Sequence, residues 1–305
     1  MKTFNKPPKT FAEQLEILKS RGMTVADEQQ AIFHLGQVNY YRLGAYGLPF
    51  EKTHTPHCFK PNTQFEQIWD VYVFDRELRL LLLDAIERIE VAIRTRFAYE
   101  IAHRHGTHAY MDKQYFKNEL SWQKSLDILR SEIDRADEVF IDHYKRNYDT
   151  PALPPIWVVC EVMSFGQLSK WYNLLSPKQT RKEIAEHFSC DEKQFEGVLH
   201  HLVYLRNLCA HHARLWNRKL TKTLAKPRSK PFGLAAQCNF DESTSANRKI
   251  YNSLVFILYF LDKIAPQHSW RSRLLQLFKK HPNINTFAMG FAQDWQTFLI
   301  WQDKD

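Results

Sequence analysis

The sequence predicts an all-α protein whose helices form one main bundle. Glycine is scarce, with 9 residues among 305, and long stretches lack both glycine and proline, the residues that most often interrupt helices. Hydrophobic residues make up 44% of the chain, which is ample for the core of one large domain or two small ones. Apolar side chains also recur at steps of three and four along several segments, the spacing of an amphipathic helix.

The first 63 residues predict short helices, an irregular segment and a loop. The stretches KTFAEQLEILKSRG and ADEQQAIFHLGQ are helical in character, and Gly22 suits a C-cap of the first. The aromatic stretch NYYRLGAYGLPF contains two glycines and predicts an irregular packed segment. Residues 51–63 predict a loop that contains His54, His57 and Cys58. These three lack a fourth ligand at the spacing of zinc sites, so we expect no metal.

A long helix is expected from Phe65 to His105, where neither glycine nor proline occurs, and Gly106 is expected to end it. Glu90 lies at the edge of its apolar stripe, four residues before Arg94. Such a spacing ordinarily gives an ion pair worth a few tenths of a kcal/mol. The stripe consists of Leu82, Ile86, Ile89, Ile93, Phe97 and Ile101.

The rest of the chain predicts further helices, and the proline-rich PALPP at 151–155 separates two of them. We expect one apolar helix over IWVVCEVMSFGQLSKWYNLL, with Gly166 inside it. The expected helical ranges after the long helix are 118–147, 156–175, 178–188, 191–217, 246–264 and 270–280.

No feature of the sequence indicates a secreted or membrane protein. The basic N-terminal stretch MKTFNKPPKT has no apolar region behind it. The longest apolar run, LVFILYFL, is far too short to span a bilayer. The five cysteines are widely spaced and form no CxxC pair, so they fit reduced thiols. We therefore expect a cytoplasmic protein.

The net charge of +8 is concentrated in one segment. No acidic residue lies between Glu196 and Asp241, and the eight lysines and arginines of that interval equal the net excess of the whole chain. A basic segment in an otherwise balanced protein favours a localised contact with a polyanion. The alternative interpretation is a solvated loop rich in lysine.

The helix expected over residues 198–218 has two chemically different sides when it is drawn at 100° per residue. One side is apolar, and the other gathers an imidazole, an amide and two guanidiniums. Arg206 lies at the border between them. The apolar side holds Val198, Leu202, Leu205, Cys209, Ala213 and Trp216, and the polar side holds His200, Tyr204, Asn207, His211, Arg214 and Arg218.

These residue types suit the cleavage of RNA phosphodiesters. Histidine titrates near neutral pH and can take or give a proton, and arginine can bind a phosphate and stabilise its developing charge. A single histidine on a helix is more often a packed or surface residue, but Arg206, Asn207 and His211 occur together here. No carboxylates are clustered as in a metal-dependent nuclease, so we expect metal-independent cleavage and no cofactor.

The arrangement of Arg206, Asn207, Ala210 and His211 resembles the Arg-x4-His signature of the HEPN superfamily. Five other stretches resemble the Abi-like (AbiD/AbiF) abortive-infection proteins of bacteria over nearly the whole chain. They are KPPKTFAEQLEILKSRG, NYYRLGAY, FDRELRLLLLDAIERIEVAIRTRFAYEIAH, PPIWVVCEVMSFGQLSKWY and MGFAQDW.

This resemblance implies an endoribonuclease of anti-phage defence, with Arg206 and His211 catalytic and Asn207 supporting. It implies a HEPN-like helical domain at 61–265, an N-terminal extension at 1–60 and a C-terminal helical segment at 266–305 that packs on the core. Because HEPN sites are commonly built where two motifs meet and this chain has one good copy, a homodimer is implied. Members often carry an acidic residue on an earlier helix near the arginine; Glu87 and Glu90 are the candidates, and Glu90 is favoured.

Two functions from different classes follow from these features. The first is an RNA-cleaving effector, and the second is a non-catalytic RNA-binding or scaffold protein of a defence or toxin-antitoxin system. RNA is the expected partner in both, as substrate or as a bound inhibitor, and no membrane is involved. The residues expected to bind RNA are His200, Tyr204, Arg214, Arg218, Lys219, Lys222 and Arg228.

Overall fold

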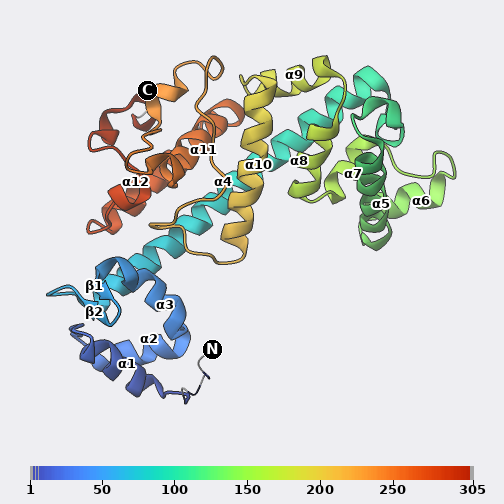
Figure 1. Ribbon diagram of the computed structural model, residues 1–305. Helices are drawn as coiled ribbons and strands as arrows, with labels where there is room; N and C mark the ends of the chain where they lie inside the picture. Colours follow the sequence, from blue (N-terminus) through green and yellow to red (C-terminus); the bar gives the residue numbers. More distant parts are fainter. Residues whose placement is uncertain (1–2, 4, 6, 303–305) are drawn as a thin grey trace.

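The computed structural model describes residues 3, 5 and 7–302, and this part of the chain is mostly helical. Twelve α-helices and one two-stranded sheet lie within the described residues, together with short 3-10 turns (Figure 1). The all-α prediction is confirmed. None of these helices combines the length and the apolar character that crossing a membrane requires.

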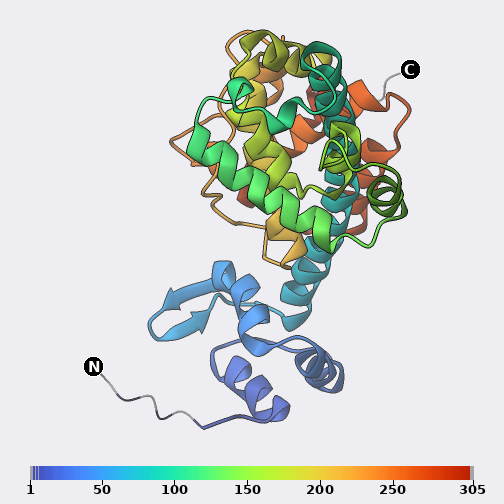
Figure 2. The ribbon, with the colours of Figure 1, turned by 90° about the vertical axis from the view of Figure 1, so that its right-hand side faces the viewer.

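Three short helices and a β-hairpin form a module at the N-terminal end of the molecule. Helices α1 (Phe11–Ser20), α2 (Glu28–Gln37) and α3 (Tyr40–Gly47) precede the strands β1 (Glu51–His54) and β2 (His57–Phe59). The module stands apart from the main body, at one end of the helix that follows (Figure 2). The hairpin is a correction, because we expected residues 51–63 to be a loop.

Helix α4 (Phe65–His105) is the spine of the fold. Its 41 residues make it about 60 Å long at 1.5 Å per residue, and it packs against α3 at one end and against α7, α9, α10, α11 and α12 along its length. The predicted stripe from Leu82 to Ile101 is buried. Gly106 ends the helix at φ 97°, so this helix and its end are confirmed.

Four helices lie on one side of α4, and here two of the helical ranges expected from the sequence are wrong. Helices α5 (Glu119–Arg135) and α6 (Val139–Asn147) are separated at residues 136–138, within the range predicted as one helical region. Helices α7 (Ile156–Val162) and α8 (Phe165–Leu174) replace the single apolar helix that we expected. The break occurs because Ser164 caps α8, its hydroxyl accepting a hydrogen bond from the Gln167 N–H at 3.2 Å.

The last four helices complete the core. Helices α9 (Lys178–His187) and α10 (Glu192–Ala210) pack against α4 and against each other, and α11 (Tyr251–Ile264) is buried over most of its surface. Helix α12 (Trp270–Lys280) packs on α4. Residues 281–302 form short turns that lie on α11, where the Trp301 indole donates a hydrogen bond to the Tyr251 hydroxyl at 3.2 Å.

Candidate functional site

Helix α10 carries the Arg–Asn–His motif at its C-terminal end. Asp191 caps its start, accepting a hydrogen bond from the Gln194 N–H at 2.8 Å. One side of the helix is packed into the core, which fixes its orientation relative to α4. The buried side chains of this side are Phe195, Val198, Leu202, Leu205 and Cys209.

The motif coincides with the end of α10. His211 is the C-cap residue, and His212 has the left-handed backbone conformation, with φ at 56°. The His212 N–H donates to the Cys209 carbonyl at 3.0 Å, and the Ala213 N–H donates to the Leu208 carbonyl at 2.9 Å. These two bonds form a Schellman motif, which ends the helix sharply.

The prediction that this helix runs through residue 217 is therefore wrong. His200, Tyr204 and Asn207 share α10, but Arg214 and Arg218 lie beyond its end and do not continue the polar strip. Glycine or asparagine usually adopts the left-handed C′ conformation, so the sequence around His212 gave no signal of the helix end.

A buried carboxylate holds the turn that follows the motif. Asp75 of α4 is fully buried and accepts hydrogen bonds from the backbone N–H groups of Leu215, at 3.1 Å, and Trp216, at 2.6 Å. The Tyr46 hydroxyl, at 2.7 Å, and the Arg79 guanidinium also donate to it. Burial raises the pKa of the Asp75 carboxyl, whereas these four donors act in the opposite direction. The turn after the motif is thus tied to the spine of the fold.

Two arginines connect the same turn to the N-terminal module. Arg42 of α3 donates to the His212 carbonyl at 2.7 Å, and Arg214 donates to the Ala45 carbonyl at 2.6 Å. Burial lowers the pKa of Arg214. Arg214, which we predicted to bind RNA, is therefore engaged with the protein backbone. The module thus contributes directly to the position of the helix end.

The three motif side chains project from this fixed backbone into solvent. Arg206, Asn207 and His211 are all exposed. The Arg206 guanidinium donates to the Asn207 amide oxygen at 3.4 Å. Among the described residues, no other side chain forms a hydrogen bond or ion pair with these three side chains. They are free to contact a ligand, and their backbone is held in place.

Glu90 has other partners. Its carboxylate forms an ion pair with Arg94, and Arg94 also donates to the Cys160 carbonyl on α7. Within the described part of the chain, Glu90 and Arg206 form no hydrogen bond or ion pair. A catalytic contribution of Glu90 stays a prediction. Its partner Arg94 lies on the same helix, and it is Arg94 that connects α4 with α7.

The basic segment after the motif returns along α10. We name residues 219–228 the return segment, because it runs beside the helix toward the helix N-terminus. Its exposed Lys219, Lys222 and Arg228 are thus held close to α10. Three hydrogen bonds fix it: Thr221 N–H to the Tyr204 hydroxyl at 3.3 Å, His201 to the Lys222 carbonyl at 3.1 Å, and the Gln194 amide to the Ala225 carbonyl at 3.1 Å.

Tyr204 and Arg218 meet at the start of the return segment. Burial tends to raise the pKa of the Tyr204 phenol, but hydrogen bonds that involve Thr221 and Arg218 outweigh it and lower this pKa. Arg218 is half-buried. Tyr204 and Arg218 therefore have protein partners, whereas His200, Lys219, Lys222 and Arg228 are exposed.

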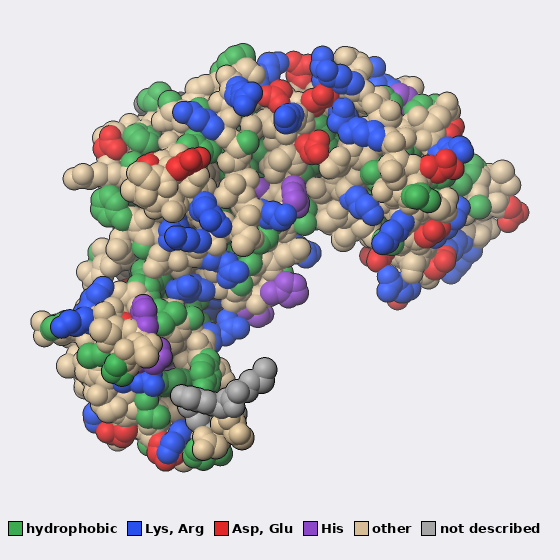
Figure 3. Space-filling view, in the orientation of Figure 1, with side chains coloured by type: hydrophobic (Ala, Val, Ile, Leu, Met, Phe, Trp, Pro, Cys, Tyr) green, Lys and Arg blue, Asp and Glu red, His purple; other side chains and the backbone are tan. Residues whose placement is uncertain are grey.

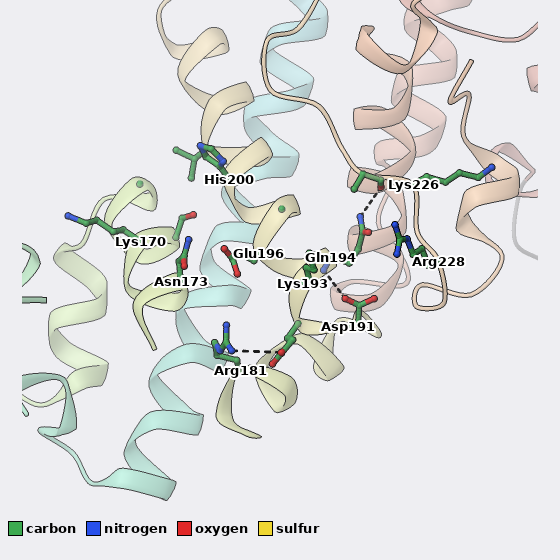
Figure 4. Close-up of a pocket in the computed structure, with 16 residues that line it drawn as sticks. Lys170, Asn173, Arg181, Asp191, Lys193, Gln194, Glu196, His200, Lys226 and Arg228 are labelled. Atoms are coloured by element: carbon green, nitrogen blue, oxygen red, sulfur yellow. Dashed lines mark hydrogen bonds and ion pairs between the residues drawn. The ribbon is translucent and has the colours of Figure 1, made fainter. Parts of the chain in front are cut away.

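A cleft of about 940 Å³ lies between α8 and the return segment, with α10 at its floor (Figure 4). Lys170 and Asn173 project from α8 on one side, and Lys226 and Arg228 lie on the other. Three acidic residues line the cleft. Asp191 caps α10 and Glu192 pairs with Arg181 at 3.8 Å, so Glu196 is the one acidic lining residue outside these two contacts. The remaining cationic groups make the cleft suited to a polyanion.

The cleft leads toward the motif. Glu196, His200 and Val203 line it from α10, and Asn207 follows them at the same steps of three and four. These four residues therefore share one face of the helix. Figure 3 shows an arch-shaped molecule, and on the side turned to the viewer lysine and arginine side chains gather beside the inner edge of the arch, with histidines among them.

The side of this cleft formed by α8 and α9 could not be predicted from the sequence. Lys170, Asn173 and Arg181 come from α8 and α9, and they gave no signal in the sequence, because isolated polar residues on amphipathic helices are usually solvated. Lys226 belongs to the basic interval and could have been singled out. Of the predicted RNA-binding residues, His200 and Arg228 line the cleft.

The comparison with protein families agrees with this architecture. Residues 33–217 match the model of the family described as Abi-like protein, so the chain belongs to that family. Membership suggests a role in abortive infection. The match ends just after the turn held by Asp75, so the whole return segment, α11 and α12 lie outside it. No curated protein and no solved structure shows significant similarity to the chain.

Replacing Asp75 by asparagine should destabilise the protein and loosen the turn. The Asp75→Asn amide cannot balance the buried Arg79 charge, so we expect a loss of about 3–5 kcal/mol in the free energy of unfolding. Urea denaturation measures this loss, and hydrogen exchange should show faster exchange at Leu215 and Trp216. Asp84→Asn, at an exposed pair with Arg273, is the control and should cost less than about 1 kcal/mol. Equal costs would contradict the role of Asp75.

His201 should make the protein less stable in acid. Burial lowers its pKa to about 4, and its ring contacts both the Lys222 carbonyl and the Ser253 hydroxyl, which suits the neutral form. The unfolded chain binds this proton near pH 6.5, so stability present above that pH is lost as the pH falls toward 4, by about 3 kcal/mol. Urea denaturation from pH 7 to 4 should show a smaller loss in His201→Gln than in the wild type. The same loss in both would exclude His201 as the cause, and exposed His143→Gln is the control.

Proposed function

We propose that this chain is a metal-independent endoribonuclease of abortive infection, of the AbiD/AbiF type with a HEPN motif. The observation that carries the proposal is the placement of Arg206, Asn207 and His211. All three side chains are exposed, yet the backbone beneath them is fixed by the Schellman turn and by Asp75. An exposed and preorganised set of this kind suits catalysis better than it suits the stability of the fold.

The proposed reaction is attack of an RNA 2′-hydroxyl on the adjacent phosphorus. His211 takes the hydroxyl proton, the new O–P bond forms, and the bond to the 5′-oxygen of the next nucleotide breaks. The products are a 2′,3′-cyclic phosphate and a 5′-hydroxyl. Arg206 binds the phosphate and stabilises the added charge, and Asn207 orients Arg206 through the 3.4 Å contact.

The leaving oxygen needs a proton, and a second motif is the natural source. A homodimer that brings two α10 ends together would supply His211 of the second copy as the general acid, while His211 of the first acts as the base. The exposure of the motif leaves room for such a composite site.

The cleft and the return segment would bind the rest of the RNA. His200, Lys222 and Arg228, with Lys219, are exposed and contribute positive or titratable groups along α10. Arg214 and Tyr204 would support the site rather than contact RNA, since Arg214 donates to the Ala45 carbonyl and the Tyr204 hydroxyl accepts from the Thr221 N–H.

A second candidate function is non-catalytic RNA binding or scaffolding. It is favoured by the cationic cleft, because that surface does not depend on His211 to bind a polyanion. The two functions differ in what they require of the histidine.

His211→Ala should abolish cleavage of RNA. The test incubates a mixed RNA pool with the protein in EDTA, after copurified nucleic acid has been removed, and analyses the new ends. Wild-type protein should leave 2′,3′-cyclic phosphates, and His211→Ala should cut at least about 100-fold more slowly because the proton transfer is lost. Exposed His143→Ala is the matched control and should cut normally.

Charge reversal at the exposed Lys219 and Lys222, compared with His211→Ala, separates the two candidate functions. If wild type and His211→Ala bind RNA equally, neither cuts it, and only the charge-reversed variant loses binding, the scaffold function is correct and the nuclease proposal fails.

A further inference from the structure

The hairpin of the N-terminal module brings together three side chains that the sequence did not group. Glu51, His54 and His57 offer ligand atoms that all lie within 4.8 Å of one another. From the sequence, His54, His57 and Cys58 form an incomplete ligand set. The structure replaces the cysteine with Glu51, which makes a different set of three.

A β-bulge is the reason that Glu51 joins the histidines. His54 pairs directly with His57 across the hairpin, so their side chains share one face. In a regular strand Glu51, three residues before His54, would point to the opposite face. The register shifts between Glu51 and Thr53, so one extra residue is accommodated and Glu51 is re-aimed to the face of the histidines. The same register places Cys58 opposite Thr53, on the other face.

The atoms converge as metal ligands do. The Nδ1 atom of His54 lies 2.5 Å from a Glu51 carboxylate oxygen, and the Nδ1 atom of His57 lies 3.0 Å from both oxygens. In a tetrahedral zinc site with bonds near 2.0–2.1 Å, neighbouring ligand atoms are about 3.3 Å apart. Small rotations of the two imidazoles would therefore open room for an ion between them and the Glu51 carboxylate.

Burial and exposure also fit a metal site. The Glu51 side chain is only 5% exposed, whereas those of His54 and His57 are 64% and 44% exposed. The carboxylate is therefore surrounded by protein, whereas the imidazoles can bind an ion that arrives from solvent. Cys58 is excluded by its face, so water would fill the fourth position.

We propose that Glu51, His54 and His57 form a binding site for a divalent transition-metal ion, with Zn²⁺ as the best match. Two imidazoles and one carboxylate are a ligand set that suits zinc. The bound ion would clamp the two strands of the hairpin. Phe50, the residue before Glu51, stacks on Trp216 at a ring distance of 6.3 Å, so the clamp would brace the module beside the turn that Asp75 holds. This site is separate from the motif of α10 and does not depend on the proposed nuclease function.

Zinc titration of the tag-free, metal-stripped protein tests the proposal. Isothermal titration calorimetry with ZnCl₂ should show one saturable site per chain. His54→Ala and His57→Ala should each weaken its affinity at least tenfold, because each removes one of the proposed ligands. Cys58→Ser and exposed His143→Ala are the matched controls and should bind zinc as the wild type does.

Two results would overturn the proposal: no saturable binding, or binding that His54→Ala and His57→Ala leave unchanged. If either variant fails to fold, modification of the wild type by diethyl pyrocarbonate decides. Mass spectrometry should show that zinc protects His54 and His57 and leaves His143 reactive. Equal modification of all three with and without zinc would also reject the site.

Discussion

The buried carboxylate of Asp75 is the contact on which the arrangement of the candidate site depends. It accepts hydrogen bonds from the backbone of Leu215 and Trp216, from the Tyr46 hydroxyl and from Arg79. A buried carboxylate without such donors would be costly, and the donors without it would be unpaired. One side chain therefore joins the spine helix α4, the N-terminal module and the turn that follows the motif.

Because Asp75 fixes the turn after α10, the two sides of this helix have different roles. The inner side of the helix packs into the core, and the backbone beyond its end is captured by Asp75 and Arg42. The outer side is left to Arg206, Asn207 and His211, whose side chains form no hydrogen bond or ion pair with any other side chain in the described part of the chain. The return segment and α8 then form the walls of a cationic cleft that leads to these residues. Rigid support beneath exposed polar groups is the arrangement expected of a site that holds a charged ligand.

The long helix α4 was predictable, whereas helix α3, the hairpin, and the breaks between α5 and α6 and between α7 and α8 were not. The stripe from Leu82 to Ile101 predicts α4 because one periodic pattern covers many turns. The end of α10 could not be predicted, since His212 adopts a left-handed conformation that contacts from Asp75 and Arg42, far away in the sequence, hold in place. The grouping of Glu51 with His54 depends on a bulge, and the cleft depends on where the return segment lies. Such features arise from tertiary contacts, which local patterns do not report.

The central claim is that the end of α10 and the adjoining cleft hold RNA. Its most direct test is ultraviolet crosslinking of the wild-type protein to an RNA whose 2′-hydroxyls are methylated, so that it can bind without being cut. The crosslinked peptides are then identified by mass spectrometry. We expect crosslinks within residues 200–211 and 219–228, and fewer at high salt because phosphate contacts weaken there. Crosslinks confined to α5 and α6, with none on α10 or the return segment, would contradict the account.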